Sequence, residues 1–389
     1  MSRNVFIIAG EPSGDRLGAG LITGLKQIED ITFDGVGGTM MSAAGLKSRF
    51  DMSELSVMGL VEILPKIPRL LRRVRETANA VIETQPDVLI TIDSPDFCLR
   101  VAERARAQLP NLKVVHYVAP SVWAWRPERA EKMARHVDHV LSLLPFEPPL
   151  MEAAGMSSDF VGHPVVAEKT PTKKQGRDLR DALGISKEAK LITLLPGSRK
   201  SEIARMLPIY LNAARQIYLK DPSVHFCVAV AQSVVNEVTD GVKDAEIPLS
   251  LLLPKRDVDE TESRKRSLYR ESKLAIATSG TVALELAAQN CPMVIAYKAN
   301  WATTRMVKKM AQIDTANLIN ILTDSRTVPE FLFEAATAEN ISASALDLLS
   351  SENHPQKQAL KDAMIALGKG QKGTELWAAR SVLRFLDQR

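Results

Sequence analysis

Residues 273–285 read KLAIATSGTVALE, and this stretch contains the unit from which the fold is built. Its first part is an apolar run typical of a buried strand, and its last part, from Gly280, has the apolar spacing of a helix. The turn between them carries hydroxyl groups and a glycine, and Glu285 follows one helical turn later. The stretch therefore predicts a strand, a glycine turn and a helix, with polar groups gathered where the strand ends.

The same alternation of short apolar runs and longer helical patterns continues along the whole chain. Nearly uninterrupted apolar runs are expected of parallel strands that helices cover on both faces. These runs are residues 4–10, 87–93, 113–119 and 139–144 in the first half, and residues 190–196, 224–231, 249–254, 273–279 and 292–298 in the second. Because 389 residues exceed what one core usually organises, each set predicts its own doubly wound sheet. The predicted fold class is α/β, with two Rossmann-like domains.

Between the two sets, residues 163–180 lose the apolar periodicity and accumulate Pro, Lys and Gly, which predicts the interdomain connection. We therefore expect a first domain over residues 1–165 and a second over residues 166–345. Helices over residues 346–389 would pack back on the chain or on a partner subunit, which leaves a homodimer open. Two such domains predict a ligand cleft between them, outside the carboxyl ends of both sheets.

The composition is that of an ordinary globular protein, with 45% hydrophobic residues, 25% charged residues and a net charge of +4. The three cysteines, Cys98, Cys227 and Cys291, are odd in number and far apart, so a reducing cytoplasm is favoured over a disulfide framework. No apolar run approaches the roughly 18 to 20 residues that span a bilayer. If the protein contacts a membrane, we expect it to lie on the surface.

Two glycine turns compete as the phosphate site. The first, GEPSGD at residues 10–15, lacks the spacing of a dinucleotide fingerprint and has no Walker lysine. Glu11 and Asp15 place carboxylates where phosphate oxygens would lie, and like charges repel strongly when partly desolvated. This turn is better suited to sugar hydroxyls.

The second half of the chain offers the opposite chemistry. The turn after the strand at 190–196 supplies a cation, and the turn after the strand at 273–279 opens a helix whose free N–H groups suit an anion. Glu285 could accept both ribose hydroxyls from the same helix face. The alternative is that Ser279 merely caps the helix. The residues assigned to this diphosphate site are Gly197, Ser198, Arg199, Ser279, Gly280, Thr281 and Glu285.

Taken together, the motifs resemble those of the lipid A disaccharide synthases, which are inverting glycosyltransferases of the GT-B fold. The motifs are GEPSGD at 10, SPDF at 94, PSVWAWR at 120, GHP at 162, LPGSR at 195, SGTVALE at 279, NL at 317 and VPEFL at 328. The resemblance covers essentially the whole chain and implies two Rossmann-like domains facing each other across a cleft. It also implies transfer of 2,3-diacylglucosamine from UDP to 2,3-diacylglucosamine 1-phosphate, giving the β-1′,6-linked disaccharide 1-phosphate and UDP.

The resemblance also implies residue roles. Asp96 of SPDF matches the candidate general base of the family; the alternative is an Asp that caps a helix, and Glu11 and Asp15 are rival bases. Asn317 joins the UDP-sugar site. On the acceptor side we expect Gly14, Asp93, Ser121, Trp123 and Arg126, although the tryptophans of this motif could equally be packing residues. Arg199 and the SGT turn would offset the charge of the leaving group, so neither a metal nor a cofactor is expected.

Residues 57–75 combine apolar residues near helical spacing with Lys66, Arg69, Arg72, Arg73 and Arg75. Such a segment is typical of an element that lies on anionic lipid headgroups, although an ordinary covering helix of a Rossmann domain has the same pattern. A substrate with acyl chains favours contact with the inner leaflet. We therefore expect a cytoplasmic enzyme that associates peripherally with the inner membrane.

Two positions depart from the family pattern: Cys98 stands where Asn is common, and Glu334 where Gln is usual. Cys98 removes a polar contact, and a carboxylate at Glu334 would repel phosphate, so its role as a ligand is in doubt. Two other functions remain open. They are a UDP-sugar 2-epimerase of the same fold, and a nucleotide-binding regulator without turnover. Nucleic acid is not an expected partner, because the basic residues do not interleave with aromatic ones.

Overall fold

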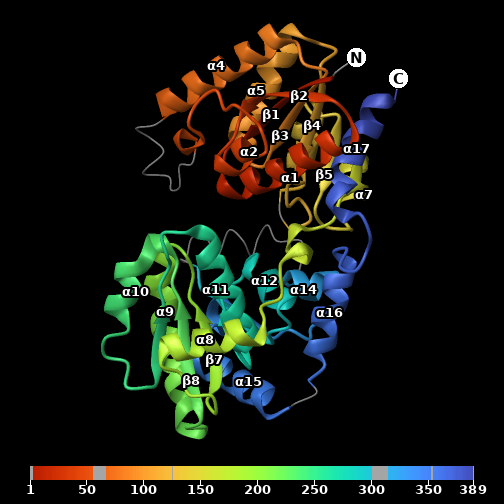
Figure 1. The fold of residues 1–389 in the computed structure, drawn as a ribbon. Helices are drawn as coiled ribbons and strands as arrows, with labels where there is room; N and C mark the ends of the chain where they lie inside the picture. Colours follow the sequence, from red (N-terminus) through yellow and green to blue (C-terminus); the bar gives the residue numbers. More distant parts are fainter. Residues whose placement is uncertain (1–2, 56–66, 125, 300–313, 352–353, 389) are drawn as a thin grey trace. The chain divides into compact units, whose positions relative to one another are not determined.

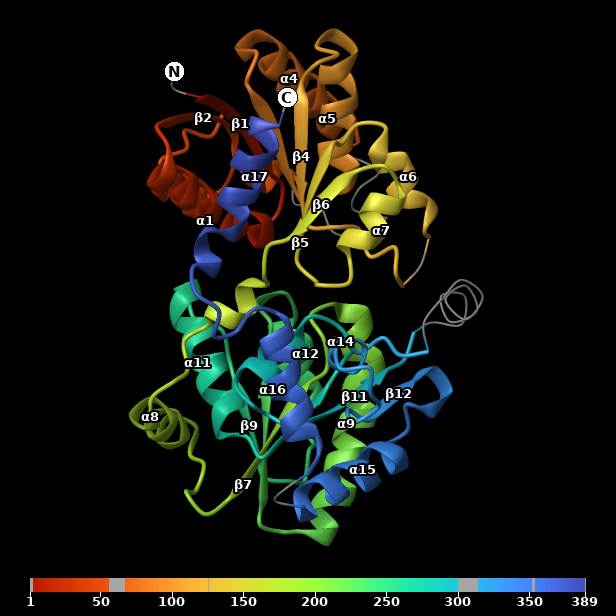
Figure 2. The same ribbon diagram turned by 90° about the vertical axis from the view of Figure 1, so that its right-hand side faces the viewer.

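The computed structural model describes residues 3–55, 67–124, 126–299, 314–351 and 354–388. The chain forms two compact units. Residues Met1–Pro164 and Gly370–Arg389 make up the first unit, and residues Val165–Lys369 make up the second. Each unit has its own parallel six-stranded sheet with helices on both faces (Figures 1 and 2). The predicted α/β class with two Rossmann-like sheets is confirmed.

The first sheet has the strand order β2-β1-β3-β4-β5-β6. Its strands are β1 Arg3–Ala9, β2 Ile31–Val36, β3 Val88–Ile92, β4 Lys113–Tyr117, β5 His139–Ser142 and β6 Ser157–Phe160. Its helices are α1 Pro12–Ile28, α2 Thr39–Ala43, α4 Ile67–Thr84, α5 Pro95–Gln108, α6 Glu128–Ala134, α7 Pro148–Ala153 and α17 Trp377–Asp387, with 3-10 turns at Met52–Glu54 and Thr374–Leu376.

Alternation along β1 divides the core of this unit into two layers. Phe6 and Ile8 pack with α4 and α5 on one face, and Val5 and Ile7 pack with α1 and α17 on the other. Successive side chains of a strand point to opposite faces, so a run without polar residues is what a sheet covered on both sides requires.

The second sheet has the order β12-β11-β10-β7-β8-β9. Its strands are β7 Lys190–Leu195, β8 Val224–Ala229, β9 Leu249–Leu252, β10 Leu274–Ala277, β11 Met293–Tyr297 and β12 Glu330–Leu332. Its helices are α8 Lys173–Leu183, α9 Lys200–Lys220, α10 Val235–Gly241, α11 Val258–Glu271, α12 Val282–Ala288, α14 Leu318–Leu322, α15 Ala338–Ser350 and α16 Gln356–Ala366, with 3-10 turns at Pro164–Ala167, Gln232–Val234 and Phe333–Ala335. A core of this unit lies where α9 and α15 pack on the sheet.

Each sheet reverses its strand order at one place. In the first unit this is between β1 and β3, and in the second it is between β7 and β10. The loops at such a switch point diverge to opposite faces and leave a crevice outside the carboxyl ends of the strands. The loop after β1 contains GEPSGD and the loop after β3 contains SPDF; the loops after β7 and β10 contain LPGSR and TSGT. Topology therefore brings together the motifs within each unit.

Within residues 163–180, which the sequence analysis assigned to the interdomain connection, helix α8 begins at Lys173. Thr172 and Gln175 form a capping box at its start, and Arg180 Nε donates to Glu271 Oε2 of α11 at 2.8 Å. The polar residues from Lys173 onwards lie mostly on the exposed face of this helix.

The C-terminal helix α17 belongs to the first unit and lies beside α1 (Figure 1). The Phe385 ring stacks on His139 with 5.0 Å between ring centroids, and Lys113 Nζ donates to the carbonyls of Leu386 and Gln388 at 2.9 Å. Residues 338–366, with α15 and α16, belong to the second unit. The domain limits expected from the sequence, and an association with a partner subunit, stay predictions.

Candidate functional site

A cavity of about 840 Å³ lies in the second unit at the carboxyl ends of β7 and β10. All seven residues assigned to the diphosphate site contribute to its lining. Further parts of the wall come from the loops after β8 and β9 and from α11. The volume is in the usual range of small-molecule sites, about 300 to 1,000 Å³.

The turn after β7 is held by a carboxylate that the sequence reasoning did not single out. Glu202 is only 8% exposed, and its Oε2 accepts the backbone N–H groups of Ser198 at 3.0 Å and Arg199 at 3.3 Å. Gly197 has φ +119°, and a Cβ there would lie 2.6 Å from Glu202 Oε2, so the position requires glycine. The two N–H groups of this turn are therefore occupied.

The guanidinium of Arg199 is the charged group that this turn presents. Its Nη1 donates to Glu202 Oε1 at 2.9 Å, while its side chain stays 67% exposed. Lys200, the next residue, forms an ion pair with Glu237 of α10 at 2.6 Å. Glu202 thus orients Arg199 at the cavity wall without burying it, as a residue that binds a phosphate group requires.

The turn after β10 has open backbone donors. Within the described residues, the N–H groups of Ser279, Gly280 and Thr281 make no hydrogen bond. Gly280 has φ +152°, and the space where its Cβ would stand is empty. The N-cap of α12 is Thr281, without a side-chain hydrogen bond. The alternative interpretation of Ser279 as a helix cap is therefore wrong.

Glu285 faces the cavity beside a cation of α11. Lys265 Nζ lies 3.9 Å from Glu285 Oε2 and 3.1 Å from Glu262 Oε1, and all three residues line the cavity. A carboxylate next to a diphosphate is repulsive unless a positive charge lies near it. Lys265 supplies part of that charge, because it is shared with Glu262 and lies closer to it. Nothing in the sequence indicates this contact, because α11 has the pattern of an ordinary covering helix.

Asn317 has a structural task and is not among the residues that line the cavity. It is the N-cap of α14, where its Oδ1 accepts the N–H groups of Ile319 at 2.8 Å and Asn320 at 3.4 Å. Its Nδ2 is buried without a hydrogen-bond partner. The role of Asn317 in binding the sugar nucleotide stays a prediction.

Asp15 in the first unit is 4% exposed and accepts three backbone N–H groups. Oδ1 accepts those of Gly38 at 2.8 Å and Met41 at 3.0 Å, and Oδ2 accepts that of Met40 at 3.0 Å. These donors belong to the start of α2, which has four unsatisfied N–H groups as every helix does. The structure gives Asp15 the task of holding α2, and its role as an alternative base stays a prediction.

The turn after β3 is strained. Asp93 and Ser94 have φ of +51° and +43°, a region that residues other than glycine rarely adopt. Asp93 Oδ1 accepts the N–H of Ser94 at 2.9 Å, and a Cβ on Gly10 would lie 2.6 Å from Ser94 Oγ. The glycine of the first motif therefore makes room for the second.

Three carboxylates gather at this switch point. Burial, and then the charge of Asp93, raise the pKa of Glu11 above its ordinary value. Asp96 is exposed in the first turn of α5. The alternative interpretation of Asp96 as a helix cap is wrong, because Ser94 occupies the N-cap position and makes no side-chain cap. The role of Asp96 as the general base stays a prediction.

The remaining acceptor-side residues differ in their surroundings. Gly14 is buried in α1, where a Cβ would lie 3.4 Å from Ile92 and from Ala9. Ser121 is exposed, and Arg126 is half-buried with φ +53°. Trp123 is half-buried, and its indole Nε1 donates to Glu147 Oε1 at 3.3 Å. Trp125 lies outside the described residues.

Cys98, which replaces the usual Asn of the motif, is fully buried below this turn. Its Sγ lies 4.0 Å from the carbonyl oxygen of Ile92, so it packs against the strand end. Glu334 lies in the 3-10 turn that follows β12, next to Phe333 with φ +58°. Its role as a ligand stays open.

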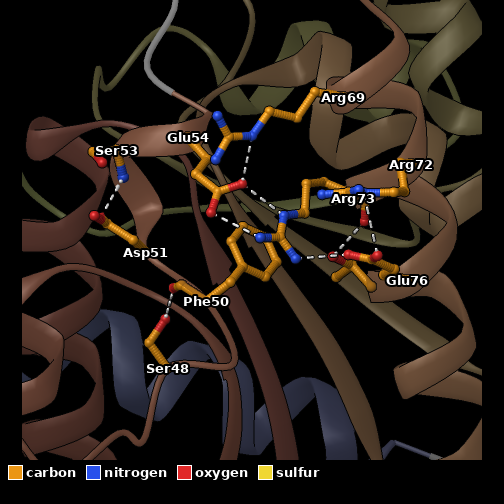
Figure 3. Close-up of polar contacts among 10 residues, drawn as sticks. Ser48, Phe50, Asp51, Ser53, Glu54, Arg69, Arg72, Arg73 and Glu76 are labelled. Atoms are coloured by element: carbon orange, nitrogen blue, oxygen red, sulfur yellow. Dashed lines mark hydrogen bonds and ion pairs between the residues drawn. The ribbon is translucent and has the colours of Figure 1, made fainter.

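The basic apolar segment is described only from Ile67, where α4 begins; residues 57–66 lie outside the described residues. Figure 3 shows that Arg69, Arg72 and Arg73 of this segment meet carboxylates. Glu54 accepts from Arg73 Nη2 at 2.7 Å and from Arg69 Nε at 2.9 Å, and these two guanidinium groups lower the pKa of Glu54 to about 2. Glu76 pairs with Arg72 at 3.4 Å and with Arg73 at 2.7 Å.

Arg73 is therefore a structural residue. Besides its two carboxylate partners, its guanidinium lies 4.3 Å from the centre of the Phe50 ring. The exposed residues at this end of α4 are Ile67, Pro68, Arg69, Leu71, Arg72, Arg75 and Glu76. Of the basic ones, Arg72 and Arg75 are joined by Arg69, whose side chain stays 56% exposed beside Glu54.

Within the described residues, no group of three or more His, Cys, Asp or Glu side chains is placed to hold a metal ion. No helix in the same part of the chain is both long and apolar enough to cross a membrane.

Comparison with known proteins identifies one family. The family model described as lipid-A-disaccharide synthetase matches residues 5–378. The lipid-A-disaccharide synthase of Ruegeria pomeroyi is 49% identical over 383 residues, covering 97% of this chain and 94% of the relative. The protein of the same name from Rhodospirillum centenum is 39% identical, covering 99% and 95%.

Solved structures similar to the chain have the same fold at much lower identity. A UDP-GlcNAc 2-epimerase from Neisseria meningitidis, bound to UDP-GlcNAc, has a TM-score of 0.66 at 14% identity and covers 98% of both chains. A glycosyltransferase from Rickettsia africae has a TM-score of 0.58 at 12% identity and covers 99% of this chain and 98% of its own. At these identities the likeness shows the fold alone.

Proposed function

The chain belongs to the lipid-A-disaccharide synthase family of glycosyltransferases, and from that membership we propose that it transfers 2,3-diacylglucosamine from UDP to 2,3-diacylglucosamine 1-phosphate with inversion. The products are the β-1′,6-linked disaccharide 1-phosphate and UDP. The observation that carries the proposal is the cavity at the β7/β10 switch point, which combines a cation, open N–H groups and a carboxylate beside a lysine.

UDP binds in this cavity of the second unit. Arg199 and the open N–H groups of Gly280 and Thr281 bind the diphosphate, because charge-assisted hydrogen bonds are the strong ones. Glu285 accepts the ribose hydroxyls, and Lys265 offsets its charge. When the bond to the anomeric carbon breaks, negative charge grows on the leaving diphosphate. The same preorganised donors stabilise it.

The acceptor sugar binds at the carboxyl edge of the first sheet. Asp96 takes the proton from the acceptor hydroxyl as that oxygen attacks the anomeric carbon. Arg126 binds the 1-phosphate, and Trp123 packs on the sugar or its acyl chains. The acyl chains stay in the inner leaflet, beside the exposed start of α4.

Purified protein incubated with both acyl substrates in mixed micelles tests the reaction. We expect UDP and a tetraacyl disaccharide phosphate to form in step. UDP release without disaccharide would contradict the acceptor assignment. Epimerisation of a UDP-sugar without any acceptor would replace the proposal by the 2-epimerase function, and nucleotide binding without either product would favour a regulator.

Glu285→Ala is expected to weaken UDP binding by about 30- to 900-fold, since two hydrogen bonds from ribose to a charged group are lost, each on the order of 1 to 2 kcal/mol. Isothermal titration with UDP measures the change. Glu285→Gln, which keeps an acceptor oxygen, should lose less. If 2′-deoxy-UDP and UDP were distinguished equally well by the wild type and by Glu285→Ala, the ribose assignment would be wrong.

Ile67→Ser combined with Leu71→Ser is expected to lower binding to anionic phospholipid vesicles on the order of tenfold, because less apolar surface is buried in the interface. Co-sedimentation measures it. The matched control is Leu219→Ser with Ile365→Ser, which changes two exposed apolar residues of the second unit. Equal vesicle binding by the two double variants would show that α4 only covers the sheet and does not contact lipid.

A further inference from the structure

Glu147 is a nearly buried carboxylic acid, 3% exposed, to which the proposed reaction assigns no task. It lies between β5 and α7, and β5 pairs with β4 in the first sheet. The loops that follow β4 and β5 therefore leave the same edge of the sheet side by side. The loop after β4 carries PSVWAWR, the motif expected to receive the acceptor.

The two oxygens of Glu147 join these two loops. Oε1 accepts the indole N–H of Trp123 at 3.3 Å, and Oε2 accepts the backbone N–H of Leu144 at 2.9 Å. The Phe146 ring contacts the Trp123 ring edge to face, with 5.5 Å between centroids and 85° between planes. Among the described residues, Trp123 thus has one polar and one aromatic side-chain partner, and both belong to the β5–α7 loop.

We propose that Glu147 is a positioning residue for the acceptor: its ionised carboxylate fixes the Trp123 loop, and its protonation loosens that loop and weakens acceptor binding. The proposal rests on the proposed function, since it takes the Trp123 loop as part of the acceptor site. An ionised carboxylate accepts from both N–H groups, whereas a neutral carboxyl group is a weaker acceptor and has one O–H donor facing N–H donors.

The protonation change falls in an accessible range. Burial raises the pKa of Glu147 to about 7, and the N–H groups of Leu144, Trp123 and Leu143 oppose this rise. Ionisable groups on the flanking segments are Arg126, Glu128, Arg129, Glu131 and Lys132 around α6, Glu152 on α7, His139 on β5 and Asp159 on β6. Among the described residues, none of these charges contributes to the pKa of Glu147.

The direction of the effect follows from this pKa. Above pH 7 the carboxylate is ionised and holds Trp123, so the KM for the acceptor is low. Below pH 7 the group is neutral, and the KM rises. Glu147→Gln has no charge at any pH and presents one acceptor and one donor, so it mimics the protonated state throughout.

The first test needs no substrate. The intrinsic tryptophan fluorescence of the wild type is expected to titrate with a midpoint near pH 7. Trp123→Phe should lose this titrating component while the other tryptophans still emit, and Glu147→Gln should emit without titrating. A midpoint near 7 that persisted in Glu147→Gln, or in Trp123→Phe, would overturn the assignment.

The second test separates positioning from folding. Acceptor KM and kcat are measured from pH 6 to 8.5 for the wild type and for Glu147→Gln. We expect the KM of the variant to exceed that of the wild type by about tenfold at pH 8 and to match it at pH 6. The kcat of the variant should stay within about twofold of the wild-type value. The acceptor phosphate titrates near pH 6, but its effect is the same for both proteins and cancels in the ratio of their KM values.

The outcomes distinguish this inference from the function on which it rests. Parallel pH profiles for the two proteins would overturn the positioning role even if both make disaccharide. If neither makes disaccharide, the proposed reaction fails, and the fluorescence titration alone still decides whether Glu147 controls the Trp123 loop. A residue with only a structural role would change the melting temperature without making the KM ratio depend on pH.

Discussion

Asp96→Asn lowers kcat by about 10³-fold while UDP affinity stays within about twofold, if Asp96 takes the proton from the acceptor. Asparagine keeps the size and shape of the side chain but cannot accept a proton. Asp96 is exposed in the first turn of α5 and does not cap that helix, so the fold should be unaffected. Steady-state turnover with both acyl substrates, together with titration of UDP, measures the two quantities.

The control for this prediction is Glu11→Gln, which removes the rival carboxylate at the same switch point. Burial and the charge of Asp93 raise the pKa of Glu11. If Glu11 were the base, kcat would therefore begin to fall on the acidic side at a higher pH than with an unperturbed carboxylate. We expect this acidic side of the kcat profile to be unchanged in Glu11→Gln. Near wild-type turnover in Asp96→Asn, with a large loss in Glu11→Gln, would transfer the role of base to Glu11.

The sequence located the two turns that line the cavity of the second unit because each follows a buried strand. Apolar runs located β7 and β10, and the polar groups after them had to lie at the carboxyl ends of the strands. Their adjacency followed once the two strands proved to be neighbours at the switch point. The reasoning needed only which strands exist and that they are parallel.

The strands that the sequence reasoning missed are β2, β6 and β12, and all three lie at sheet edges. Their burial alternates or is only partial, because an edge strand has fewer neighbours to cover it. A short strand such as Ser157–Phe160 therefore lacks the apolar run that marked the central strands. Tertiary pairing determines its conformation more than its own residues do.

The missed site residues have a different cause. Lys265 acts on Glu285 from another helix, and Glu54 binds Arg73 from 19 positions earlier in the chain. The charge pattern of α4 predicted that its arginines bind lipid headgroups, because a sequence does not show which carboxylate forms an ion pair with each arginine. Glu202 was closer to being visible, since an acidic residue at the third position of a helix is a capping signal.

Asp15→Ala is expected to lower the free energy of unfolding by about 3 to 5 kcal/mol, because three N–H groups at the start of α2 lose a buried acceptor. Chemical denaturation measures it. The matched control is Asp51→Ala, which removes one exposed cap from the 3-10 turn Met52–Glu54, where Asp51 Oδ1 accepts from Ser53 at 2.9 Å. That loss should be about 0.5 to 1 kcal/mol.

The same variant decides between the two roles of Asp15. If Asp15 holds α2, its replacement lowers the free energy of unfolding. Turnover per folded molecule then equals the wild-type value at a temperature where the variant is fully folded. If Asp15 is a base, stability changes little and turnover is lost at every temperature. The three N–H groups occupy both carboxylate oxygens, and a proton taken from substrate would break the bonds that hold the helix. We therefore expect the first result, which leaves Asp96 and Glu11 as the carboxylates that can serve the acceptor hydroxyl.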